Sequence, residues 1–297
     1  MSLVSFVKIR GNEVANAIEE SLKLIGFKFQ KDAQKIVIKA NMCYYWDSSI
    51  GQTTDPKFVG ALIDVIRKNT TSNPKISIVE SDASAMKCKH AFKFLGYEKL
   101  AQKYNVSLVN LSEDKYDNVK VTAGGQSFNL MVPHTIKDAD LKINVTKIKY
   151  SLDKIKITCA LKNIFGCNPY PKKFKYHPKL DEAIVAINKA MKFDLCLVDG
   201  NIVSGASPCR LGLVMAGVDS VAVDVAAARI AGVNPRTIKY IQLAQKEGLG
   251  SSSFTQVGVP LDYFRARYPK KDVRKKLMSK AYDMVVLLKL AGRLGLE

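Results

Sequence analysis

Short runs of β-branched and other apolar residues alternate along the chain with segments whose apolar residues recur at helical spacing. Such alternation is typical of an α/β domain, in which helices connect the strands of one sheet. The pattern predicts a mixed or mostly parallel sheet flanked by helices. The predicted strands cover residues 35–40, 75–80, 107–110, 140–146 and 195–199.

The clearest helical pattern covers residues 57–68, where apolar residues recur three and four positions apart. Asp55 directly before Pro56 marks the expected start, because Asp is a favoured N-cap and Pro a favoured first helical residue. Further helices are predicted over residues 89–104, with a break at Gly96, and over residues 181–191 and 219–231.

The C-terminal segment 273–294 carries an apolar stripe at helical spacing with basic residues largely off it. It predicts a basic amphipathic helix that packs on its own domain or on a second copy of the chain, or else touches an anionic membrane surface. We expect residues 1–260 to form one domain, or two lobes that meet near residue 140, and residues 261–297 to form a helical extension.

The composition is that of a globular protein, with 47% hydrophobic and 25% charged residues among 297. No uncharged apolar run is long enough for a transmembrane helix, and the first 21 residues lack the order of a signal peptide. A cytoplasmic location is expected. The six cysteines show no CxxC spacing and should be reduced, although a cluster on Cys43, Cys159, Cys167 or Cys209 is a redox alternative.

Positive charge is concentrated in two segments of a chain whose net charge is +19. Residues 137–179 hold eleven Lys against three Asp, and residues 265–280 hold eight Lys or Arg against one Asp. Focused positive charge attracts phosphates, nucleic acid and other anions. The first segment is the more informative, because its lysines alternate with apolar residues, which a purely solvated surface does not require.

Several residues of this central segment are candidates for holding an anion. Lys147 and Lys149 follow a predicted buried strand and lie two positions apart, so they share one side if the chain stays extended. Lys162 and Asn163 sit inside an apolar run beside Phe165–Gly166, where a tight turn is expected. His177 ends a loop whose other lysines, at positions 172, 173 and 175, could be merely solvated.

Polar residues after predicted strands add to this set. Glu80, Asp82 and Asp199 follow two strands at the ends where ligands gather in open α/β sheets. A carboxylate in such a place also commonly caps the next helix. The chain lacks the phosphate loop, the dinucleotide fingerprint, the paired-histidine metal motif and the nucleophile elbow. No metal site is predicted and no cofactor is indicated.

Several blocks in order resemble the domain of unknown function 362 family, over about residues 35–250. They are VIKANM (37–42), TDPKFVGALIDVI (54–66), IVESDAS (78–84), GYEKLA (96–101), DADLKINVTKIK (138–149), ITCALKNIFG (157–166), KYHP (175–178), LVDG (197–200) and GVDSVAVDVAA (217–227). The resemblance implies that polar residues from separated blocks converge on one site. The matching positions are Lys39, Asn41, Glu80, Asp82, Lys147, Lys149, Lys162, Asn163, His177, Asp199, Asp219 and Asp224.

Two features set this chain apart from the family pattern. Members often carry a Thr-His pair directly after the second lysine of the central block, where this chain has Tyr150 and Ser151. Some members also carry a ferredoxin-like cysteine module, which this sequence lacks. The family implies no established reaction.

Three functions follow as hypotheses. The leading one is an enzyme or binding protein for a small phosphorylated or carboxylated ligand, held by Lys147, Lys149 and Lys162 and oriented by Asn163. Lys149, His177 and Asp199 are then the candidate catalytic groups. The alternatives are nucleic-acid binding through the two basic segments and iron–sulfur redox work. Homo-oligomerisation is open under each of them.

Overall fold

The computed structural model describes residues 2–151 and 155–271. Its centre is an eight-stranded sheet in the order β12-β1-β11-β10-β7-β2-β3-β4, in which β11 runs antiparallel to both of its neighbours and the other neighbouring pairs are parallel. The strands are β1 (Ser2–Lys8), β2 (Lys35–Ala40), β3 (Lys75–Glu80), β4 (Ser107–Asn110), β7 (Leu141–Thr146), β10 (Leu195–Val203), β11 (Cys209–Gly217) and β12 (Phe254–Gly258).

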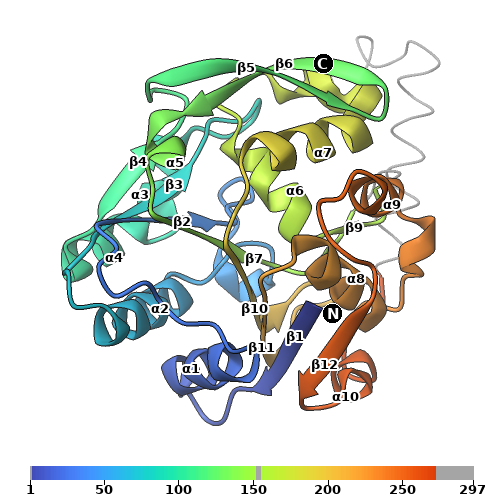
Figure 1. Cartoon of the computed structure of the whole chain (residues 1–297). Helices are drawn as coiled ribbons and strands as arrows, with labels where there is room; N and C mark the ends of the chain where they lie inside the picture. The colour runs from blue at the N-terminus through green and yellow to red at the C-terminus, as the bar shows by residue number, and fades with distance from the viewer. Residues whose placement is uncertain (1, 152–154, 272–297) are drawn as a thin grey trace, which may run out of the picture.

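Helices cover both faces of this sheet (Figure 1). Because side chains alternate along a strand, Ile36 and Ile38 of β2 face one helical layer and Val37 faces the other. The first layer holds α1 (Val14–Leu24), α2 (Pro56–Asn69), α3 (Cys88–Phe94) and α4 (Tyr97–Tyr104). The second layer holds α6 (Ala160–Ile164), α7 (Leu180–Ala190), α8 (Ser220–Ile230), α9 (Lys239–Lys246) and α10 (Leu261–Arg265).

A separate hairpin packs on α7 at the top of the view in Figure 1. Its strands are β5 (Tyr116–Ala123) and β6 (Gln126–Pro133), joined by Gly124 and Gly125, which both have the positive φ that this two-residue turn requires. The remaining short elements are α5 (His134–Lys137), β8 (Lys149–Tyr150), β9 (Ile157–Thr158) and the 3-10 helices η1 (Ser48–Ile50), η2 (Phe165–Cys167), η3 (Lys173–Lys179) and η4 (Pro235–Thr237).

The predicted α/β class is confirmed, and so are the five predicted strands, three of them with the predicted bounds. The predicted start of α2 is also confirmed, because Asp55 is its N-cap and accepts a hydrogen bond from the Lys57 backbone N–H. Strands β1, β11 and β12 and the hairpin were not predicted. The amphipathic segment 273–294 lies outside the described residues.

The domain boundary stays a prediction, and the sheet takes strands from both sides of residue 140. Across residues 2–151 and 155–271, none of the helices has both the length and the apolar character needed to cross a bilayer.

The four neighbouring strands β3, β2, β7 and β10 are parallel, so their carboxyl ends lie along one edge of the sheet. Lys39 and Glu80 stand at the ends of two of these strands. Helix α6 packs across β2 and β7 and presents Asn163 to the same place. The fold therefore gathers polar side chains from separated segments at this edge, as expected for an open α/β sheet.

Candidate functional site

A cavity of about 300 Å³ opens beyond the ends of β2 and β3. Four lysines line it, namely Lys39, Lys149, Lys162 and Lys173, together with one carboxylate, Glu80. We refer to it as the lysine cavity. Its wall also contains two amides and several aromatic side chains, namely Asn41, Asn163, Tyr44, Phe165, Phe174 and His177.

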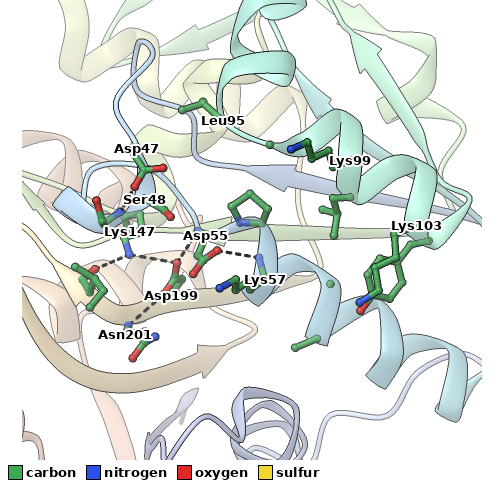
Figure 2. Close-up of a pocket in the computed structure, with 18 of the residues that line it drawn as sticks. Asp47, Ser48, Asp55, Lys57, Leu95, Lys99, Lys103, Lys147, Asp199 and Asn201 are labelled. Atoms are coloured by element: carbon green, nitrogen blue, oxygen red, sulfur yellow. Dashed lines mark hydrogen bonds and ion pairs between the residues drawn. The ribbon is translucent and has the colours of Figure 1, made fainter.

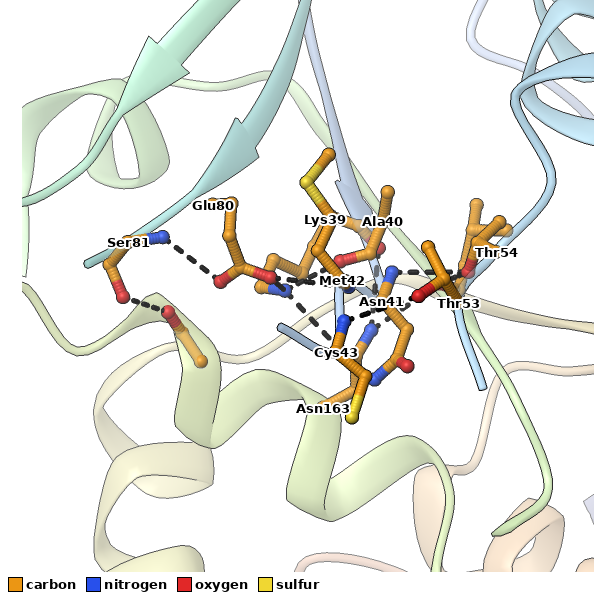
Figure 3. Close-up of polar contacts among 12 residues, drawn as sticks. Lys39, Ala40, Asn41, Met42, Cys43, Thr53, Thr54, Glu80, Ser81 and Asn163 are labelled. Carbon is orange, nitrogen blue, oxygen red and sulfur yellow. Dashed lines mark hydrogen bonds and ion pairs between the residues drawn. The ribbon is translucent and has the colours of Figure 1, made fainter. Parts of the chain in front are cut away.

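Lys39 and Glu80 form a buried ion pair at the floor of the lysine cavity (Figure 3). The Lys39 Nζ lies 2.8 Å from Glu80 Oε2 and also donates to the backbone carbonyl of Ala40. Gly166 approaches this pair so closely that an added Cβ would lie 3.0 Å from Lys39 Cε and 3.1 Å from Glu80 Oε1. A side chain at position 166 would therefore press on this ion pair.

A chain of buried amides runs away from Lys149. Its Nζ donates to Asn41 Oδ1 at 2.7 Å, Asn41 Nδ2 donates to Asn163 Oδ1 at 2.9 Å, and Asn163 Nδ2 donates to Asn144 Oδ1 at 2.7 Å. The last amide donates to the backbone carbonyl of Ala160. A charged lysine nitrogen has no acceptor and can only donate. Its hydrogen bond therefore fixes the side on which Asn41, and each amide after it, places its oxygen. Figure 3 shows Asn41 and Asn163 within this network.

Lys149 and Lys173 are buried without a carboxylate partner. Lys149 donates to two amide oxygens, those of the Asn41 side chain and the Gln52 backbone, and Lys173 donates to the Ser81 hydroxyl and the Gly166 carbonyl. Within the described residues no carboxylate oxygen lies within 4.0 Å of either nitrogen. Burial lowers the pKa of both ammonium groups, and for Lys149 the neighbouring lysines lower it further.

A second cavity, of about 740 Å³, lies between α2, α4 and the end of β10 (Figure 2). We refer to it as the aspartate cavity, since four aspartates and four lysines line it. At its inner wall the Lys147 Nζ lies 3.2 Å from Asp199 Oδ2 and donates to the Ile202 carbonyl. Both side chains are almost completely buried.

Asp199 uses both of its oxygens in this second cavity. Oδ2 accepts a hydrogen bond from the Asp55 backbone N–H and forms the ion pair with Lys147, and Oδ1 accepts a hydrogen bond from the Asn201 backbone N–H. Burial, together with the Asp199 charge, raises the pKa of the neighbouring Asp55 carboxyl. The hydrogen bond from Asp55 to Asp199 thus joins the start of α2 to β10, and Lys147 balances the charge of Asp199.

The predicted site residues divide between the two cavities. Those that line the lysine cavity are Lys39, Asn41, Glu80, Lys149, Lys162, Asn163 and His177. Lys147 and Asp199 line the aspartate cavity instead, because the chain leaves β7 after Thr146 and sends its next two lysines in different directions. The structure therefore separates two lysines that their spacing placed together.

Three of the predicted carboxylates satisfy backbone N–H groups near helix starts and line neither cavity. Asp82 accepts from the Cys88 N–H at the start of α3, and Asp219 is the N-cap of α8. Asp224 accepts from the first two N–H groups of α6, and burial raises its pKa to about 7. The Asp224 hydrogen bonds hold the start of α6, the helix that carries Lys162 and Asn163 of the lysine cavity.

Sequence reasoning missed Lys173. It lies in the loop that was interpreted as solvated, yet its side chain is only 8% exposed and lines the lysine cavity, while the adjacent Phe174 is 63% exposed. The only available signal was the three-residue spacing of Lys173 and Tyr176, which places both on the inner face of η3. Tyr150, where relatives often have threonine, donates its hydroxyl to the carbonyls of Ala231 and Pro269.

The cysteines are all free thiols, and burial raises the pKa of Cys167 and Cys196 to about 12. Residues 2–151 and 155–271 contain no group of three or more His, Cys, Asp or Glu side chains placed to hold a metal ion. Of the four cysteines considered for a cluster, Cys43 lines the lysine cavity.

The model of the family described as "Domain of unknown function (DUF362)" matches residues 36–229. The chain belongs to the DUF362 family. The matched range contains every lining residue of the lysine cavity, so the cavity is built from the family domain itself.

Two known proteins resemble this DUF362 chain. The thylakoid-associated protein of Synechocystis sp. is 28% identical over 184 residues, which cover 57% of this chain and 55% of the relative. The solved lactate racemase apoprotein of Thermoanaerobacterium thermosaccharolyticum superposes with a TM-score of 0.48 and 13% identity, covering 78% of this chain and 58% of the other. The chain therefore spans little more than half the length of either protein.

Proposed function

We propose that this DUF362 protein binds a small phosphorylated or carboxylated compound in the lysine cavity, as a binding protein or as an enzyme. The observation that carries the proposal is the pair of buried lysines, Lys149 and Lys173, that face the cavity without a carboxylate partner. The cavity's one carboxylate, Glu80, is already paired with Lys39.

Burying a lysine ammonium group removes it from water, which has a cost in free energy. An ammonium group taken out of water costs several kcal/mol unless another charge offsets it, and structural proteins normally supply a carboxylate. Here the hydrogen-bond acceptors of Lys149 and Lys173 are all neutral oxygens. A bound anion at about 4 Å from such a lysine would contribute about 4 kcal/mol of attraction at an effective dielectric constant near 20. An anionic ligand therefore completes the site.

The same residues suggest a chemical role. Lys149 has a lowered pKa, so a neutral form that accepts a proton is more accessible than in an ordinary lysine. Asn41 and Asn163 hold its surroundings in a fixed orientation, and His177 at the cavity wall is a second group for proton transfer. Asp199 is less suited to this role, because its oxygens are occupied by Lys147 and two backbone N–H groups.

Isothermal titration calorimetry tests the proposal with oxalate, glycerol 3-phosphate and inorganic phosphate. We expect at least one of them to bind the native protein, and Lys149→Met and Lys173→Met each to weaken that binding at least tenfold. Lys57→Met is the matched control, since it removes an exposed lysine of the aspartate cavity and should leave the affinity unchanged. Equal weakening by all three variants would contradict the proposal.

Nucleic-acid binding is the alternative, and salt dependence separates the two functions. If the protein neutralises many phosphates of RNA or DNA, its affinity should fall steeply as salt rises, and Lys149→Met should matter little. A small anion in an enclosed cavity should show a shallow salt dependence and a strong effect of Lys149→Met.

The proposal places the protein in the cytoplasm, where reduced cysteines such as the buried Cys88 and Cys196 are expected. The relative in Synechocystis is associated with thylakoids, so membrane association is the competing location. Fractionation of cells into soluble and membrane fractions decides between them.

A further inference from the structure

Exposed aromatic rings gather where the lysine cavity opens. Tyr44 and Phe174 both line the cavity, although they are 45% and 63% exposed. Each has an aromatic neighbour, since the Trp46 ring lies 5.6 Å from that of Tyr44 and the His177 ring lies 4.7 Å from that of Phe174. Single exposed rings are common on protein surfaces, but two ring pairs at one cavity mark a binding surface.

The backbone supports the same interpretation. Tyr44 has a φ of +52°, in the left-handed region that bulky side chains rarely adopt. A residue held in this region costs about 1–3 kcal/mol, and such residues cluster at ligand sites. The η3 helix is also unusual, because it buries the charged Lys173 and exposes the apolar Phe174 directly beside it. The segment at Tyr44 and the η3 helix thus each present an aromatic ring at the cavity in a locally unfavourable arrangement.

We infer that the ligand of the lysine cavity carries a flat aromatic or heteroaromatic ring, which stacks on Tyr44 or Phe174 while its anionic group binds Lys149 and Lys173. The inference rests on the proposed function, which supplies the anion, and adds the part of the ligand that the cavity does not enclose. The anionic group would lie beside Lys149 and Lys173, and the ring would lie where Tyr44 and Phe174 line the cavity.

The chemistry at the opening fits a ring better than a flexible apolar chain. Aromatic side chains attract flat π-systems through offset stacking and edge-to-face contacts, and this attraction does not depend on the identity of the ring. The Phe174 and His177 rings already meet edge to face, with an interplanar angle of 60°. A third ring can extend either pair without displacing buried side chains.

Trp46 is the only tryptophan of the chain, so its fluorescence reports on this place alone. We would titrate the native protein with two matched pairs of anions, AMP against ribose 5-phosphate and benzoate against cyclohexanecarboxylate. Within at least one pair the aromatic member should bind about tenfold more tightly and change Trp46 emission. A preference in the phosphate pair alone or the carboxylate pair alone would show which anionic group the ligand carries.

Either Phe174→Leu or Tyr44→Leu, whichever removes the ring that the ligand contacts, should reduce the preference within that pair to about twofold or less, while the affinity for its non-aromatic member stays unchanged. Phe94→Leu is the matched control, because Phe94 is equally exposed, also contacts a histidine ring, and does not line the cavity. It should leave the preference intact.

Equal affinities within both pairs would overturn the inference while leaving the proposed function standing. Failure of all four anions to bind in a Lys149-dependent way would count against the proposed function itself. A blue shift of Trp46 emission on anionic lipid vesicles, without any response to the four anions, would show that the rings meet a membrane surface, and would also overturn the inference.

Discussion

The lysine cavity and the aspartate cavity each contain four lysines, but they differ in what faces those lysines. In the aspartate cavity four aspartates balance them, and the buried Lys147 is paired with the buried Asp199. In the lysine cavity one glutamate faces four lysines, and Lys149 and Lys173 have only neutral acceptors.

We infer from this difference that charge balance, rather than cavity size, distinguishes the proposed ligand site from a structural ion pair. The aspartate cavity is more than twice as large, yet its buried charges, Lys147 and Asp199, are already paired with each other. The smaller cavity holds buried positive charge that a bound anion would offset. We therefore propose that the lysine cavity binds the ligand and that the Lys147–Asp199 pair contributes to stability.

The largest expected effect is on stability, and it separates Lys147 from Lys149. Lys147→Met should lower the free energy of unfolding by about 3–5 kcal/mol, because it leaves Asp199 buried without its partner. Lys149→Met should change it by less than about 1 kcal/mol, since no buried carboxylate is left unpaired and water in the cavity can serve Asn41. Urea unfolding of the two variants measures both values.

If Lys147→Met is as mild as Lys149→Met, the division of the two cavities is wrong. Lys147→Met combined with Asp199→Asn provides the control, because removing both charges should restore part of the lost stability.

Each cavity is lined by a glycine whose replacement by alanine should have a smaller effect, Gly166 in the lysine cavity and Gly60 in the aspartate cavity. Gly166→Ala should lower stability by about 1–2 kcal/mol and ligand affinity about tenfold, because its Cβ would press on the buried Lys39–Glu80 pair. Gly60→Ala in α2 should stay within about 1 kcal/mol of the native stability, since the gain in helix propensity offsets contact with the Tyr104 and Leu100 side chains. Thermal unfolding and calorimetry measure the two effects, and similar results for both variants would count against a special role for Gly166.

The smallest expected effect is proton uptake on binding. Burial and nearby lysines lower the pKa of Lys149 in the free protein, and a bound anion should raise it again. Between these two pKa values Lys149 is neutral in the free protein and charged in the complex, so binding takes up protons. Calorimetry in buffers of different ionisation enthalpy measures the uptake, which should decrease in Lys149→Met. Proton release, or uptake unchanged in the variant, would contradict this account of Lys149.

The same shift has a consequence for stability. Because the folded pKa of Lys149 lies below its unfolded value, its contribution to stability is present above the unfolded pKa and is lost as the pH falls through the folded pKa. The native protein should therefore gain stability relative to Lys149→Met as the pH rises through that window.

Much of the fold could be predicted because its strands are short apolar runs with sharp ends. Strands β2, β3 and β4 have the predicted bounds, and Asp55 with Pro56 marks the start of α2. The Gly124–Gly125 pair is a local hairpin signal of the same kind, although the hairpin was not predicted. Strands β1 and β12 depend on long-range pairing with each other, which no local pattern reports.

Most residues of the lysine cavity could be predicted from the sequence, but which of the predicted residues lie together could not. Lys39, Glu80 and Asn163 come together because parallel strands end at one edge, which the strand order alone decides. The separation of Lys147 from Lys149 depends on a change of chain direction after β7. The burial of Lys173 depends on how η3 packs, so neither was visible in the spacing of lysines.

A crystal structure of the protein soaked in sodium bromide tests the central claim most directly, because anomalous scattering locates each bound anion. We predict a bromide ion in the lysine cavity, within contact of Lys149 or Lys173, that is absent from crystals of Lys149→Met. Bromide at the exposed lysines Lys57, Lys99 or Lys103 of the aspartate cavity, with none in the lysine cavity, would contradict the account.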